Sequence, residues 1–315
     1  MAGLFQVLWG QADGTFLKAE TLTGTDGEPL MISVEKEDSI EGNPLLGNLV
    51  LETICTRPTA VDWDGDGDLD LVVGNFGGSF YLFHGEGEGN FNPAAEPLLA
   101  NGEPLKIKGQ HSDPFVVDWD ADGDLDLLSG SSSGGVQWAE NKAGAASLPE
   151  LEPFVALIEP STPARSDGLL YESDLTGPNA STRIWIDDVN TDGKLDILVG
   201  DSTRLVSPVE GLSEEDYVEK LAAWKNEMEE SLQVYRNEQL KGGGEAGSDE
   251  RDSEESKTEQ TVVTSWLAKL FGLGNEEEEK SDLDKAMERY RELSQQQSEF
   301  MKTEATGYVW LYLQR

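Results

Sequence analysis

The sequence predicts an all-β protein made of repeated antiparallel strand units, with an α-helical segment inserted into the last unit. One acidic motif occurs three times, each time between short apolar runs that are typical of strands. The 34 glycines provide for the many tight turns that such a protein needs. Between residues 206 and 305 the composition shifts to charged residues and helix formers, which indicates a separate element.

The repeated motif defines the strand units. It reads DWDGDGDLDLVVG at 62–74, DWDADGDLDLLSG at 118–130 and DVNTDGKLDILVG at 188–200. Aromatic runs follow the first two copies, SFYLF at 79–83 and GGVQW at 134–138. Each unit is therefore predicted as strand, acidic turn, strand, glycine turn and strand.

A second similarity links the N-terminal residues to the unit that contains Asp62. LFQVLWGQADGTF at 4–16 matches SFYLFHGEGEGNF at 79–91, so that Gly10 and Phe16 lie 75 positions before Gly85 and Phe91. The match continues from 20–32 to 96–107 with one residue of slippage, and it predicts strands at 4–9 and 16–22. We expect these residues to be the second half of a repeat whose first half would precede Met1.

The third unit is interrupted before its aromatic strand. We assign that strand to GYVWLY at 307–312, with Trp310 as the counterpart of Trp138. A helix is predicted over 214–239, a disordered linker over 241–260, a short apolar patch at 264–273, and a second helix over 281–302 that starts with Ser281 and Asp284 in a capping box. The apolar stripe of the first helix is predicted to comprise Tyr217, Leu221, Trp224, Met228, Leu232 and Tyr235.

The acidic loops have the donor pattern of calcium sites. Oxygen-bearing side chains stand at positions 1, 3, 5 and 9, a glycine able to adopt positive φ stands at position 6, and position 7 offers its backbone carbonyl. Magnesium needs tighter octahedral geometry, and softer metals prefer His or Cys. The predicted ligands are Asp62, Asp64, Asp66, Asp68 and Asp70; Asp118, Asp120, Asp122, Asp124 and Asp126; and Asp188, Asn190, Asp192, Lys194 and Asp196. A generic acidic turn without metal is the competing interpretation.

The motif DWDGDGDLDLVVG, followed by an aromatic strand and a glycine turn, resembles the FG-GAP/VCBS repeat. The resemblance covers residues 1–205 and 306–315, and the sequence looks most like exported bacterial proteins of planctomycete type. It implies a β-propeller of four-stranded blades with calcium held in hairpin loops. The chain would then comprise propeller residues 1–209, the helical insertion 210–304 and a final propeller strand 305–315.

Two complete blades are visible, and propellers usually close with four or more. We therefore expect an open arc that is truncated relative to its family rather than a closed ring. Such an arc exposes apolar blade faces and strand edges at both ends, which favours self-association.

Charge and composition exclude several classes of function. Lys and Arg number 23 against 62 Asp and Glu, and the formal net charge of −39 excludes a phosphate-backbone binder. No stretch is apolar enough for membrane insertion. Residues 1–16 have neither a basic n-region nor a long apolar h-region, so we do not expect them to be a signal peptide. The single cysteine, Cys55, excludes an intramolecular disulfide and is predicted to be a buried apolar residue.

No catalytic constellation stands out. His84 and His111 are the only histidines and are assigned turn or surface roles, while Trp63 and Trp119 are predicted to pack between blades rather than to stack on sugars. The function predicted is a non-catalytic, calcium-binding propeller module for binding or adhesion, outside the cytoplasm, with a protein or polysaccharide ligand. The alternative is a calcium-dependent polysaccharide lyase or hydrolase built on a propeller. A cytoplasmic scaffold is disfavoured because cytosolic calcium is too scarce for weak sites.

Overall fold

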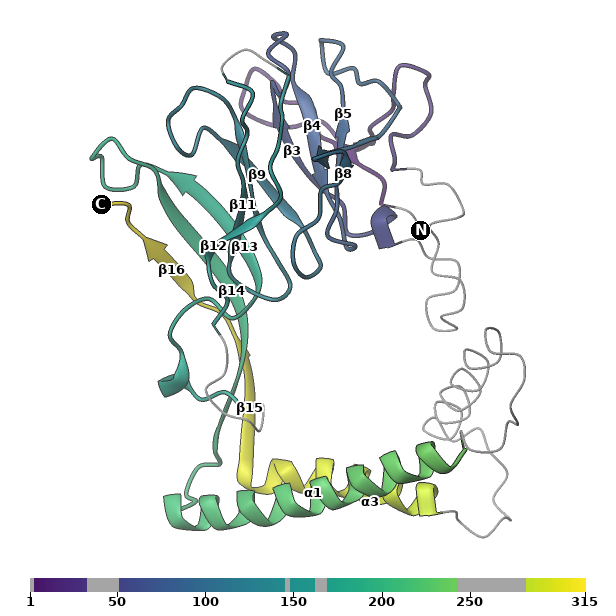
Figure 1. Cartoon of the computed structure of the whole chain (residues 1–315), viewed down its shortest axis with the longest axis vertical. Helices are drawn as coiled ribbons and strands as arrows, with labels where there is room; N and C mark the ends of the chain where they lie inside the picture. The colour runs from purple at the N-terminus through teal and green to yellow at the C-terminus, as the bar shows by residue number, and fades with distance from the viewer. Residues whose placement is uncertain (1–2, 33–50, 145–147, 162–168, 243–281) are drawn as a thin grey trace. The chain divides into compact units, whose positions relative to one another are not determined.

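The computed structural model describes residues 3–32, 51–144, 148–161, 169–242 and 282–315 (Figure 1). The chain separates into two compact units. One is a set of antiparallel sheets that ends at Arg204 and resumes at Ala305, and the other spans Leu205–Glu304 and contains the helices. The β unit is a partial β-propeller-like assembly, as the sequence predicted.

The first blade contains four antiparallel strands in sequence order. They are β3 (Arg57–Val61), β4 (Asp70–Gly74), β5 (Phe80–Phe83) and β6 (Glu96–Pro97). β4 and β5 are buried along their whole length, which explains why their apolar residues run continuously instead of alternating with polar ones. The first acidic loop connects β3 to β4.

The second blade repeats this order with β9 (Asp113–Val117), β10 (Asp126–Gly130), β11 (Val136–Ala139) and β12 (Val155–Ile158). The second acidic loop connects β9 to β10. A short hairpin of β7 (Leu99–Ala100) and β8 (Glu103–Pro104) lies between the two blades in sequence.

The third blade is assembled from distant parts of the chain. β14 (Asp196–Pro208) lies between β13 (Ala180–Asp187) and β15 (Met301–Thr306), and β16 (Val309–Tyr312) also pairs with β14. Ile197 pairs with Tyr312 as Leu127 pairs with Ala139, so the prediction that GYVWLY supplies the missing strand is confirmed.

The predicted equivalence of Trp310 and Trp138 is wrong by one residue. Trp138 pairs with Leu128, whereas Trp310 pairs with Val199 and the counterpart of Trp138 is Leu311. Because side chains alternate along a strand, the two tryptophans therefore point to opposite faces of their sheets.

The predicted 75-residue offset is confirmed by the backbone. The bridge between Gly10 and Phe16 recurs between Gly85 and Phe91, and the bond from Leu17 N to Trp9 O recurs from Asn92 N to His84 O. β1 (Gln6–Val7) pairs with β2 (Glu20–Thr21), so the strands are shorter than the predicted 4–9 and 16–22.

One buried aspartate at position 9 of each acidic loop ties its blade together. Asp70 is 1% exposed; its Oδ2 accepts a bond from Trp63 N at 2.8 Å and its Oδ1 one from Gly85 N at 2.7 Å. The loop is thereby joined to the end of the third strand. The counterparts are Asp126 with Trp119 N and Asn141 N, and Asp196 with Val189 N and Gln314 N.

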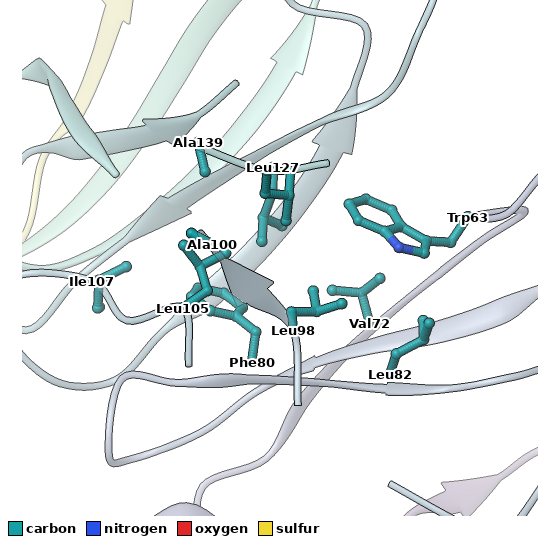
Figure 2. Close-up of a cluster of buried hydrophobic side chains, with 11 residues drawn as sticks. Trp63, Val72, Phe80, Leu82, Leu98, Ala100, Leu105, Ile107, Leu127 and Ala139 are labelled. Carbon is teal, nitrogen blue, oxygen red and sulfur yellow. The ribbon is translucent and has the colours of Figure 1, made fainter. Parts of the chain in front are cut away.

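The apolar cores lie where neighbouring sheets meet. Trp63 is 4% exposed and belongs to a cluster with Val72 of β4 and Leu127 of β10, and Figure 2 shows these side chains gathered together. Trp119 packs partly buried in the cluster that includes Leu128 and Ile197. The prediction that both tryptophans pack between blades is confirmed.

Cys55 departs from its predicted role. Its side chain is exposed, and its φ of 54° places it in the left-handed region. His111 and Ser181 have φ of 60° and 50°. Each lies two residues before the residue that pairs with the glycine of the second strand, as Cys55 does, although Ser181 already belongs to β13. Cys55 thus occupies a left-handed backbone position that recurs in all three blades, and its side chain is exposed there instead of buried.

The second unit contains two helices, α1 (Glu214–Gly242) and α3 (Asp282–Phe300). They pack antiparallel, since Trp224 Nε1 donates to Leu293 O at 2.8 Å and Ser231 Oγ to Ala286 O at 2.8 Å. Tyr217 and Leu221 are buried as predicted, but Leu232 is 38% exposed and the small Ser231 takes the buried position beside α3. No helix in the described ranges combines the length and apolar character needed to cross a membrane.

Two predictions for the insertion lie outside the described residues. These are the apolar patch at 264–273 and the capping role of Ser281. The predicted linker 241–260 also falls outside from residue 243 onward, whereas 241 and 242 belong to α1.

The ninth-position aspartates predict a large stability effect. Asp196→Ala leaves the N–H groups of Val189 and Gln314 without their acceptor, and we expect the free energy of unfolding to fall by about 2–5 kcal/mol. Urea unfolding in the presence of a chelator measures this without any contribution from bound metal. The exposed Asp192→Ala in the same loop is the control; an equal loss for both variants would contradict the assignment.

The helical unit is expected to be dispensable for the blades. A chain that lacks 211–304, with Glu210 joined to Ala305 by a short turn, keeps β14 and β16 and the bond from Gln314 to Asp196. We expect it to retain the near-UV circular dichroism of the blades. The control lacks 307–315 and loses that bond, and we expect it to lose the third blade. Failure of the first variant to give soluble protein would contradict the prediction.

Candidate metal centre

Three hairpin loops, 62–69, 118–125 and 188–195, present the predicted ligands. The first side chain of each loop folds the loop around itself. Asp62 accepts bonds from Gly65 N at 2.9 Å and Gly67 N at 3.2 Å with different oxygens. Asp118 and Asp188 also accept two bonds with different oxygens, from the N–H groups at positions 5 and 6 of their loops, whereas Asp62 accepts from positions 4 and 6. The loops thus have one shared architecture.

The side chains at positions 3 and 5 also accept bonds from the loop. Asp64 Oδ1 accepts from Asp66 N, and Asp66 Oδ1 accepts from Asp68 N at 2.8 Å. The same pairs occur in the other loops, through Asp120, Asp122, Asn190 and Asp192. Each of these side chains is oriented by the backbone while carrying further oxygen lone pairs.

Two positions in each loop need a left-handed backbone. Position 6 has φ of 97° at Gly67, 98° at Gly123 and 86° at Gly193, which confirms the predicted role of this glycine. Position 4 also has positive φ, 77° at Gly65, but it is occupied by Ala121 (63°) and Thr191 (60°) in the other loops. The sequence does not reveal that position 4 needs a positive φ, because only the first loop has glycine there.

The predicted ligands at positions 1, 3 and 5 lie close together in the first two loops. Oxygens of Asp62, Asp64 and Asp66 lie within 4.8 Å of one another, as do those of Asp118, Asp120 and Asp122. Three carboxylates at this separation repel each other, and a divalent cation between them removes the repulsion. This donor set fits calcium.

The third loop differs in charge. Asn190 Nδ2 donates to Asp192 Oδ2 at 3.2 Å, so an internal hydrogen bond replaces one carboxylate contact. Asp188 and Asp192 remain, and Lys194 adds a positive charge at position 7. A cation would gain less here than in the loops that carry three carboxylates.

The ninth-position aspartates serve the fold first. Asp70 clusters with Asp64 and the imidazole of His84 within 4.8 Å. In the described part of the chain, Asp126 and Asp196 are not found in such a cluster. Burial raises the pKa of Asp126 to about 6, although the backbone hydrogen bonds from Asn141 and Trp119 act in the opposite direction and lower it.

The residues at position 7 are predicted to offer their backbone carbonyl oxygens to the ion, and this stays a prediction. The side chains of Asp124 and Asp68 make contacts of their own. Asp124 is 6% exposed, its Oδ2 accepts a bond from Gly144 N at 2.7 Å, and its Oδ1 is buried without a hydrogen-bond partner in the described residues. Burial, followed by the charge of Asp122, raises the pKa of Asp124. The Asp68 carboxylate lies similarly against Gly87.

His84 and Glu140 approach the loops from the end of the third strand. His84 Nδ1 lies 3.2 Å from Asp64 Oδ2, so His84 is more than the turn residue that was predicted. Glu140 occupies the equivalent place in the second blade, and its charge contributes to the raised pKa of Asp120, after burial and Asp122. An alignment of the first two units that matches Gly85 with Asn141 places His84 and Glu140 at the same position, directly before them, and is the sequence signal that points to these two residues.

The position-4 backbone predicts opposite effects of two substitutions. Thr191→Gly removes the strain of a β-branched residue with left-handed backbone, and we expect the free energy of unfolding without metal to rise by up to about 1 kcal/mol. Gly65→Ala imposes the same strain, and we expect a loss of about 1 kcal/mol. Thermal unfolding in chelator checks both, and shifts of the same sign would contradict the assignment.

Comparisons with known proteins agree with this architecture. Residues 62–129 match the family described as FG-GAP-like repeat. The matched stretch starts at the first acidic loop and ends in β10, so it contains the first two loops. No curated protein and no solved structure matches the chain.

Proposed function

Because residues 62–129 are an FG-GAP-like repeat, we propose that the chain is a non-catalytic, calcium-binding β-propeller protein that serves as a binding or adhesion module of an exported bacterial protein. The observation that carries this proposal is the clustering of three loop carboxylates, twice, on the same hydrogen-bonded scaffold. The third loop repeats the scaffold with a weaker donor set.

Calcium would act on the blades through the loops. Each loop joins the first and second strands of its blade, and its ninth-position aspartate joins it to the third. An ion that binds only the folded loop stabilises the whole blade by mass action. Millimolar calcium over a site of roughly 0.1 mM affinity contributes about 1.4 kcal/mol per site. Such sites fill outside the cytoplasm, which supports an exported location.

A binding role is supported over catalysis by the contacts of the two histidines. His84 faces the first loop through Asp64, and the His111 ring lies against Phe76 with centroids 4.4 Å apart. Each is therefore engaged in a separate place, so the two do not form a joint acid–base pair. A turnover screen on acidic polysaccharides, with and without chelator, tests this part of the proposal; calcium-dependent cleavage would contradict it.

Calcium titration tests the metal sites. We expect calcium to raise the melting temperature clearly and magnesium to raise it less, and isothermal titration to show two stronger sites and one weaker site. Asp66→Ala and Asp122→Ala should each remove one of the stronger sites. Glu103→Gln removes the same charge outside the loops and should leave the response unchanged. A melting curve that chelator leaves unmoved would show that the loops are ordinary turns.

A further inference from the structure

Three charged residues occupy one equivalent position in successive blades. Arg57 pairs with Gly74, Asp113 with Gly130 and Arg183 with Gly200. In each blade, this is the last of five consecutive residue pairs between the first and second strands. None of the three is among the site residues predicted from the sequence.

Neighbouring blades approach closely at this level. A Cβ added to Gly74 would lie 2.4 Å from Ser112 O, and one added to Gly130 would lie 2.3 Å from Thr182 O. Thr59 Oγ1 also donates across blades to Pro114 O at 2.7 Å. The three charged side chains therefore converge from three blades on one place.

The ion pairs at this place are loose. Arg57 Nε and Arg183 Nε lie 3.7 and 3.6 Å from the same oxygen, Asp113 Oδ1, which is longer than a hydrogen bond. One Nη of each arginine donates to a backbone carbonyl, of His111 and Thr182 respectively. In the described residues, the other Nη of each has no hydrogen-bond partner, so donors remain for a ligand.

The charge at this place is unbalanced. Two guanidinium groups share one carboxylate, in a chain whose formal net charge is −39. Burial lowers the pKa of Arg57, and the neighbouring charge of Arg183 lowers it further. Asp113 is 19% exposed and its partners are 22% and 43% exposed, so solvent and a ligand can reach the group. A bound anion would relieve the repulsion between the arginines.

An exposed aromatic ring lies beside the charges. Trp185 follows Arg183 by two residues on β13, so both lie on the same face of the strand, about 6.6 Å apart along it. Trp185 is 60% exposed although its ring forms an edge-to-face pair with the ring of Phe115, with centroids 5.6 Å apart. An indole face open to solvent can pack against the apolar face of a sugar ring.

We propose that Arg57, Arg183 and Trp185 form a binding site for an acidic sugar. In this site the two guanidinium groups bind the carboxylate of a hexuronate, and the sugar ring packs against the indole of Trp185. The proposal rests on the binding role proposed above and names its ligand class. Bidentate guanidinium–carboxylate contacts give orientation as well as affinity. Calcium in the acidic loops would lower the negative field that otherwise repels such a ligand.

Isothermal titration with a galacturonate oligomer tests the site, in calcium and at low salt, with a neutral glucose oligomer of equal length and a sulfated one as comparisons. We expect the uronate oligomer to bind and the neutral one not to bind. Arg57→Gln, Arg183→Gln and Trp185→Ala should each weaken the affinity at least about tenfold. Arg204→Gln, an exposed arginine outside the site, should leave it unchanged.

Asp113→Asn separates ligand binding from a purely structural ion pair. Removing the competing carboxylate should strengthen uronate binding, whereas a structural role predicts only lower stability and no gain in affinity. Equal binding of the neutral oligomer, preference for the sulfated oligomer, or insensitivity to the arginine substitutions would overturn the proposal. The calcium-induced rise in melting temperature, measured on the same variants, shows whether the calcium proposal fails independently.

Discussion

Each blade depends on one buried carboxylate that accepts two backbone N–H bonds. In Asp70, Asp126 and Asp196, one carboxylate oxygen accepts a bond from the N–H of the second residue of the loop. The other oxygen accepts from the N–H of the second residue after the third strand. The conformation of the acidic loop and the register of the sheet are therefore set by the same side chain. A cation that orders the loop must also act on the third strand, which is how a surface site can stabilise a core.

Much of the fold was predictable because the repeat is written in residues with specific backbone roles. The acidic loop, the glycine turn and the third strand recur with fixed spacing, and the 75-residue offset of the N-terminal residues follows the backbone hydrogen bonds. Helix positions 217 and 221 were also predictable from their spacing. The candidate ligands at positions 1, 3 and 5 followed from the same repeat, and the first two loops bring their three carboxylates together.

The rest depended on contacts between segments distant in sequence. The one-residue shift of Trp310 relative to Trp138 arises where the insertion rejoins the sheet, and no local pattern sets that register. His84 reaches the first loop only because β5 ends beside it. The convergence of Arg57, Asp113 and Arg183 requires knowing which strands neighbour each other. The repeat predicted the parts of each blade, but not how one blade meets the next.

The insertion also sets the order in which the blades can form during synthesis. The bond that joins a ninth-position aspartate to its third strand spans 15 residues in the first two blades and 118 in the third. At about 5–20 residues per second, Asp196 waits on the order of ten seconds for Gln314 after leaving the ribosome. Closing the longer loop costs about 1.8 kcal/mol more chain entropy. The helical hairpin offsets this cost, because Val209 N bonds to Phe300 O and brings the two ends together before β16 arrives.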